Sequence, residues 1–178
     1  TATVDDVQIP AVQVDGTNYL FLPASANLAS LNAVFTRSAE TGDLVVTGDL
    51  GSQNVSSTDP LDVSALASET DGYRIITAKV GNGTALTVRV MQATSLPTVY
   101  LTSTDASAQG RAYVDKSKQN TTMAALQMIG ADGSKISATN ITELKARGNS
   151  TFTYAEKKSY QIKLETASDL LQPGENVK

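Results

Sequence analysis

The sequence contains no histidine, no cysteine and no tryptophan, and it has only three phenylalanines. Without histidine and cysteine, this chain alone cannot form a Ser-His-Asp triad, a Cys-His nucleophile, a disulfide or a Cys/His zinc site. Aromatic residues make up 5% of the chain, and the missing tryptophan disfavours a carbohydrate-binding β-sandwich. Carboxylates, lysine, tyrosine, serine and threonine are left for catalysis.

Long apolar runs are also missing. The longest, such as Tyr19–Pro23 and Ala124–Leu126, are far shorter than the roughly 20 residues of a transmembrane helix. The chain has 178 residues, 40% hydrophobic and 18% charged, with a mean hydropathy of −0.14. These values are typical of a globular protein with one large or two small domains.

An acidic, cysteine-free composition rich in Thr, Ser, Ala and Asp is common among bacterial surface proteins, and the isoelectric point here is about 4.8. The sequence starts at Thr1-Ala2-Thr3, without an initiator methionine or signal peptide. We therefore expect an extracellular or wall-attached bacterial protein, processed at its N-terminus or cut from a longer chain.

Charge is unevenly distributed along the chain. Residues 1–110 contain four basic and eleven acidic residues, whereas residues 111–163 contain nine basic and four acidic ones. A like-charged segment is most often a solvated face, but a basic half on an acidic protein can also mark a phosphate-rich partner.

The period-2 patterns predict a mainly β fold in two pieces. Residues 1–93 have six or seven short strands separated by Gly/Asn/Asp turns, which indicates a small immunoglobulin-like β-sandwich. The expected strands include Gln8–Val14, Asn18–Leu22, Asp43–Thr47, Tyr73–Val80 and Ala85–Met91. The spacing in Leu28–Thr36 fits a helical turn and a strand equally well.

Residues 94–178 form the second, β-rich piece. Its expected strands are Thr98–Thr102, Met123–Ile129, Ile141–Arg147 and Ser159–Leu164. In the last of these, Tyr160, Ile162 and Leu164 alternate with polar residues, and no long amphipathic helix is predicted.

The most specific pattern lies between residues 145 and 164. One strand ends in Arg147-Gly148-Asn149-Ser150-Thr151, and the next is Lys157-Lys158-Ser159-Tyr160-Gln161-Ile162-Lys163-Leu164. Arginine as a fork donor and lysine as a point charge suit phosphate oxygens, so these cations could converge on one anion. The alternative is a polar hairpin loop with snorkelling lysines.

Together with Asp169-Leu170-Leu171, this pattern resembles the opening signature of the CotH family, atypical kinases first associated with spore coats. Leu96–Leu101 resembles the strand that opens the CotH module. Tyr19–Pro23 is similar to immunoglobulin-like domains that precede such modules in surface proteins of gut Firmicutes. The match covers about residues 96–171.

The resemblance implies a full module that transfers phosphate from ATP to protein Ser/Thr, using Mg²⁺ held by carboxylates located further along than Lys178. It implies that Lys163 contacts the phosphates of the nucleotide, with Arg147 and Lys158 as supporting cations. It also implies that Asn149 belongs to the same cofactor-binding site. We assign no catalytic residue and no metal ligand to these 178 residues, and we expect them to be inactive alone.

A non-catalytic adhesion or scaffold protein is the alternative function. The expected partner is a protein or protein substrate at the cell surface, not a nucleic acid or a membrane. An open sheet edge in a truncated second piece would invite pairing with another chain, so we also expect a dimer or a swapped strand.

Overall fold

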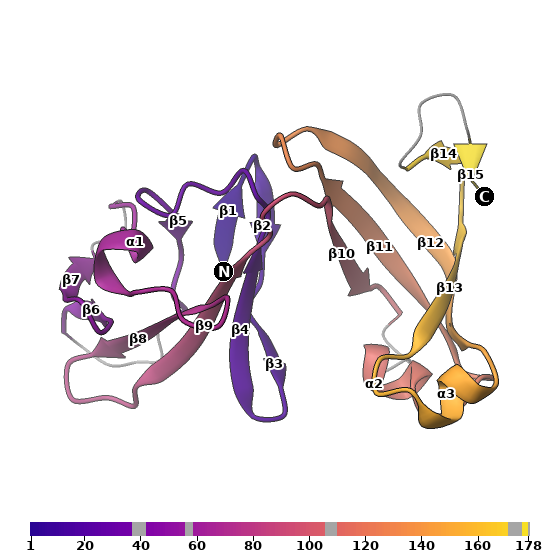
Figure 1. Cartoon of the computed structure of the whole chain (residues 1–178), viewed down its shortest axis with the longest axis horizontal. Coiled ribbons are helices and arrows are strands. Elements are labelled where there is room, and N and C mark those ends of the chain that lie inside the picture. The colour runs from indigo at the N-terminus through magenta and orange to yellow at the C-terminus, as the bar shows by residue number, and fades with distance from the viewer. Residues whose placement is uncertain (37–41, 56–58, 106–109, 171–175, 178) are drawn as a thin grey trace. The chain divides into compact units, whose positions relative to one another are not determined.

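The computed structural model describes residues 1–36, 42–55, 59–105, 110–170 and 176–177 (Figure 1). The fold is mainly β, as the sequence predicts, with 48% of residues in strands and 9% in helices. Of the sequence patterns above, Leu171 lies outside the described residues. No helix in the described part of the chain is long and apolar enough to cross a membrane.

The chain divides into two compact units. Unit 1 consists of residues 1–97 and 131–133, and unit 2 of residues 98–130 and 134–178. Unit 1 contains the strands β1 (Ala2–Val4), β2 (Val7–Ile9), β3 (Val12–Val14), β4 (Thr17–Leu22), β5 (Asn32–Ala33), β6 (Leu44–Thr47), β7 (Ser52–Val55), β8 (Arg74–Val80) and β9 (Leu86–Gln92), and the helix α1 (Val63–Leu66).

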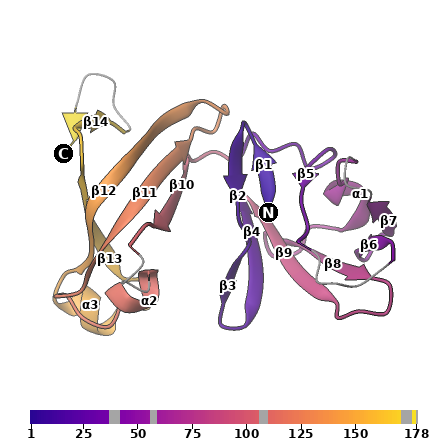
Figure 2. The ribbon, with the colours of Figure 1, turned by 180° about the vertical axis from the view of Figure 1, so that it is seen from behind.

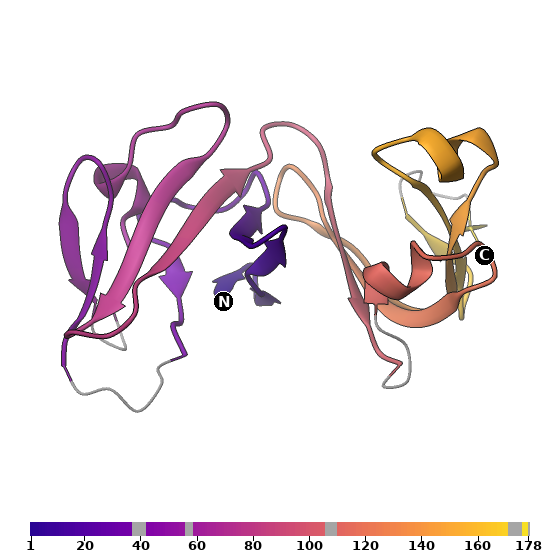
Figure 3. The same cartoon turned by 90° about the horizontal axis from the view of Figure 1, so that it is seen from below.

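Six strands of unit 1 form one sheet in the order β3-β4-β9-β8-β6-β7, and three form another in the order β2-β1-β5. Neighbouring strands of the larger sheet are antiparallel except for β4 and β9, which run parallel. Figure 3 shows β8 and β9 side by side with the β6–β7 hairpin next to β8. The region 28–36, which the sequence left open, contains β5 and no helix.

One face of the six-stranded sheet is apolar and buried. Cross-strand register places Leu20 opposite Val90, Ile76 opposite Val88, and Val46 opposite Ala78. All six side chains are buried, as expected when apolar residues alternate with polar ones along a strand. The residues between them therefore project from the opposite, solvent face.

Unit 2 contains β10 (Thr98–Ser103), α2 (Gly110–Val114), β11 (Thr121–Ile129), β12 (Lys135–Arg147), α3 (Ser150–Tyr154), β13 (Ser159–Leu164), β14 (Ser168–Asp169) and β15 (Asn176–Val177). Strands β10 to β13 form an antiparallel sheet in chain order. Helices α2 and α3 lie at the same end of this sheet (Figure 2).

The core of unit 2 lies on one face of this sheet. Its buried residues come from β11, β12 and β13 and are Ala124, Leu126, Met128, Ile141, Leu144 and Leu164. Tyr160, Ile162 and Leu170 pack against them. Within the sheet, β10 and β13 are the outer strands, each paired with a neighbour on one side.

Candidate functional site

The sequence motif occupies the β12–α3–β13 segment of unit 2. Gly148 adopts a φ of +92°, and a Cβ at this position would overlap the hydroxyl of Thr151. Glycine therefore lets β12 turn directly into α3. The Thr153 amide and hydroxyl both donate to the Asn149 carbonyl oxygen, at 3.1 Å each. The polar loop expected from the sequence contains this short helix.

Four charged residues of β12 and β13 form what we call the charged strip: Glu143, Lys145, Arg147 and Lys163. Cross-strand register pairs Glu143 with Lys163, Lys145 with Gln161, and Arg147 with Ser159. These positions alternate with Leu144, Ala146, Ile162 and Leu164, which are buried or half-buried. The strip therefore lies on the face of the sheet opposite the core.

Glu143 is the centre of this strip. Its carboxylate lies 2.7 Å from the Lys145 ammonium. The hydrogen bond from Lys145, with added attraction from Lys145 and Lys163, lowers the pKa of Glu143 below 4.5. Two lysines thus flank one carboxylate, and each keeps hydrogen-bond donors free for a further anion.

The structure does not bring Arg147 and Lys163 together around one point. Their cross-strand partners, Ser159 and Glu143, are each four residues away along a strand. At roughly 3.3 Å per residue, this separates the two positions by about 13 Å. An anion held by Lys163 is therefore closer to Lys145 than to Arg147.

Lys158 and Asn149 have contacts of their own. The Lys158 ammonium donates to the Phe152 carbonyl oxygen at 2.5 Å and lies 4.8 Å from the centre of the Phe152 ring. The Asn149 side-chain oxygen accepts a 2.8 Å hydrogen bond from Lys118. These contacts fix α3 against its flanking segments, a positioning role for both residues.

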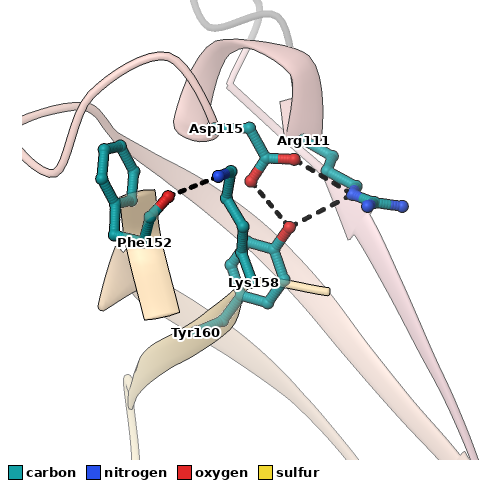
Figure 4. Close-up of polar contacts among 5 residues, drawn as sticks. All are labelled: Arg111, Asp115, Phe152, Lys158 and Tyr160. Carbon is teal, nitrogen blue, oxygen red and sulfur yellow. Dashed lines mark hydrogen bonds and ion pairs between the residues drawn. The ribbon is translucent and has the colours of Figure 1, made fainter. Parts of the chain in front are cut away.

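A second polar cluster joins α2 to β13, close to Lys158 (Figure 4). The Tyr160 hydroxyl donates to the Asp115 carboxylate at 2.7 Å, and Arg111 Nε donates to Tyr160 at 3.1 Å and to Asp115 at 3.2 Å. Burial, followed by the bond to Asp115, raises the pKa of Tyr160. The bond to Tyr160 is the main cause of a raised pKa for Arg111.

The sequence analysis did not assign Glu143 or Lys145 to the site. The signal for them was present, because Glu143, Lys145 and Arg147 repeat with a period of two on one strand and so share a face. No comparable signal existed for Asp115, which meets Tyr160 across 45 residues of sequence.

Unit 1 has a different kind of surface, which we call the Arg89 face. It lies on the solvent face of β4, β9 and β8, together with the residue that precedes β8, and consists of Tyr19, Phe21, Tyr73, Ile75 and Arg89. The rings of Tyr19 and Phe21 are nearly parallel, with centroids 5.6 Å apart. Phe21 is 40% exposed and Ile75 45%, which is unusual for large apolar side chains grouped on one face.

No family model, curated protein or solved structure matches the chain. Among the described residues, no group of three or more acidic side chains is placed to hold a metal ion.

Proposed function

We propose that unit 2 is the N-terminal, phosphate-facing part of a CotH-like module in a secreted or wall-attached bacterial surface protein, preceded by an immunoglobulin-like unit 1. The whole module would transfer phosphate from ATP to Ser/Thr of a protein substrate. One observation carries this proposal: the hairpin with the CotH-like motif presents Lys145 and Lys163 beside Glu143 on a solvent face.

The charged strip fits the phosphate part of the nucleotide. Phosphoryl transfer relies on positioning and on neutralising charge on the phosphate oxygens, and lysine supplies mobile point charges for that purpose. Glu143 orients Lys145 through the 2.7 Å contact, and Lys163 lies opposite Glu143 in register. Arg147, further along β12, would contact a more distant group of the nucleotide or substrate.

Magnesium chemistry requires carboxylates beyond those that the described residues bring together. When bound by the whole module, Mg²⁺ would neutralise charge on the phosphates. The residues of this chain would contribute the cationic side of the site, and Lys158 and Asn149 would hold α3 in place beside it.

The test is a labelled-ATP phosphotransfer assay on protein that contains the whole module, comparing wild type with Lys163→Ala. Lys157→Ala is the matched control, because Lys157 is exposed and lies outside the charged strip. The proposal expects transfer that is lost in Lys163→Ala and kept in Lys157→Ala. Absence of both transfer and Mg-ATP binding in the wild-type module would contradict it.

A second candidate, non-catalytic adhesion or scaffolding, is favoured by the Arg89 face, where apolar and aromatic side chains are exposed. Partner binding would then involve unit 1 and would not depend on nucleotide. Binding to a cell-surface protein that survives Lys163→Ala and is lost on Phe21→Ser would support this function over phosphotransfer.

A further inference from the structure

Arg89 is a half-buried cation held between two tyrosine rings. Its guanidinium carbon lies 4.7 Å from the centre of the Tyr73 ring and 5.8 Å from that of Tyr19. One terminal nitrogen donates a long hydrogen bond of 3.4 Å to the Tyr19 hydroxyl. Stacking against rings fixes the plane of the guanidinium but leaves donors at its edge unused.

No carboxylate among the described residues forms an ion pair with Arg89. The ion pairs of the described chain involve Arg74, Arg111 and Lys145 instead. A planar guanidinium with free donors is the side chain that best matches the two oxygens of a carboxylate. Arg89 therefore has donors at its edge that no carboxylate among the described residues uses.

A hollow of about 380 Å³ opens beside this guanidinium. Arg89 lines it together with Thr17, Asn18, Ile75 and Thr87. The Asn18 amide donates to the Thr87 backbone oxygen at 3.1 Å, and the hydroxyls of Thr77 and Thr87 lie 3.2 Å apart. These bonds hold two hydroxyl-bearing strands in a fixed arrangement, and two exposed apolar side chains, Ile75 and Leu86, also line the hollow.

We propose that this hollow binds one acidic sugar residue, such as a hexuronate or a sialic acid, through its carboxylate and not through the indole stacking that the absence of tryptophan excludes. The sugar carboxylate pairs with the edge of Arg89, its hydroxyls bond to Thr17 and Thr87, and a C–H face of the ring contacts Ile75. Such a site combines a few fixed polar groups with apolar contact, as small-ligand sites generally do.

Charge limits the ligand to a single acidic residue. Residues 1–97 contain ten acidic and four basic residues, so unit 1 as a whole repels a dense polyanion. An extended acidic peptide added to the sheet edge fits less well. Arg89 is on β9, two strands in from the outer strand β3, or roughly 10 Å at about 4.8 Å per strand.

The experiment is an NMR titration of the 178-residue chain with glucuronate, sialic acid, glucose, acetate and a glutamate-containing tetrapeptide. The proposal expects the two acidic sugars to bind more tightly than glucose, acetate or the peptide. Arg89→Lys keeps the positive charge but loses the paired N–H donors of the guanidinium. It should therefore weaken glucuronate binding by about tenfold, which corresponds to the loss of one charge-assisted hydrogen bond.

Two further variants separate the site from general charge effects. Thr87→Val should weaken glucuronate binding and leave any acetate binding unchanged, and the exposed cation variant Lys79→Gln should change neither. Equal binding of glucose and glucuronate, equal binding of the peptide, unchanged affinity in a folded Arg89→Lys protein, or no binding of any probe would each overturn the proposal.

Discussion

Unit 1 and unit 2 both carry cations on the solvent face of a sheet, but the two faces hold them differently. On β12, Lys145 pairs with a carboxylate 2.7 Å away. On β9, Arg89 stacks between tyrosine rings with no carboxylate partner in the described chain. Lys145, at the centre of the charged strip, is thus already paired with a carboxylate, whereas Arg89 in the acidic segment has no carboxylate partner among the described residues.

The difference shows that net charge along the sequence does not indicate which cation already has a carboxylate partner. A carboxylate beside a lysine competes with any incoming anion, whereas an aromatic ring attracts the cation through its quadrupole and leaves its net charge unchanged. Binding at the charged strip then favours a ligand of higher charge, such as a polyphosphate. The Arg89 face suits a single carboxylate.

The largest effect is expected from a substitution in the core of unit 2, which tests whether the core and not the solvent faces of the sheets stabilises the fold. Leu126 is 2% exposed, and its cross-strand partner Leu101 is 43% exposed. Leu126→Ala should lower the free energy of unfolding of unit 2 by about 2–5 kcal/mol, because a buried leucine is replaced by a cavity.

Leu101→Ala is the matched control and should cost less than about 1 kcal/mol, since surface substitutions have small effects. Denaturant unfolding followed by circular dichroism measures both. Equal losses in the two variants would show that the difference in burial between Leu126 and Leu101 does not determine which side chains stabilise unit 2.

Tyr160→Phe should have an intermediate effect. It removes the hydroxyl that donates to Asp115 and accepts from Arg111. We therefore expect the free energy of unfolding of unit 2 to fall by about 1 kcal/mol. Thermal unfolding measures it, and a double-mutant cycle with Asp115→Asn isolates the coupling. Additive losses in that cycle would mean that the cluster does not link α2 to β13.

A pH effect is expected at Tyr100 on β10. Burial raises the pKa of Tyr100 to about 12 from 10.0, so folding favours the protonated hydroxyl. This contribution to stability is fully present below pH 10 and is lost as pH rises towards about 12. Tyr100→Phe removes this titrating group, so the free energy of unfolding should fall less between pH 10 and about 12 than in the wild type. Denaturant unfolding at a series of pH values measures this difference.

The smallest effect concerns the pairing within the charged strip. Lys145→Gln removes the hydrogen bond that is the main cause of the lowered pKa of Glu143. The pKa of Glu143 should rise towards 4.5, which NMR titration of the side-chain carboxyl measures. An unchanged pKa would indicate that Lys163 or the solvent, and not Lys145, sets the charge of Glu143.

Local alternation predicted much of this fold. β13 occupies Ser159–Leu164, as the sequence indicates, because three large residues recur strictly at every second position. α3 was missed because five residues are too short to show a helical period. The Arg89 stack could not be predicted, because Tyr19 and Arg89 meet only through the parallel β4–β9 pairing.

The same reasoning explains the partial prediction of the charged strip. The motif located Arg147 and Lys163 on neighbouring strands, but their separation of about 13 Å depends on the antiparallel register. Spacing along the sequence does not determine that register when the connection contains a helix. Lys158 likewise binds a carbonyl oxygen that no sequence pattern indicates.

The central comparison is tested most directly by one set of amide NMR spectra of the isotope-labelled chain, recorded with increasing glucuronate. The account predicts shift changes at Asn18, Ile75, Thr87 and Arg89 and none at Glu143, Lys145 or Lys163, because Glu143 already pairs with Lys145 and competes with a singly charged carboxylate for both lysines. Equal changes at Lys145, Lys163 and Arg89 would show that the sugar follows positive charge in general, and would contradict the distinction drawn between the two faces.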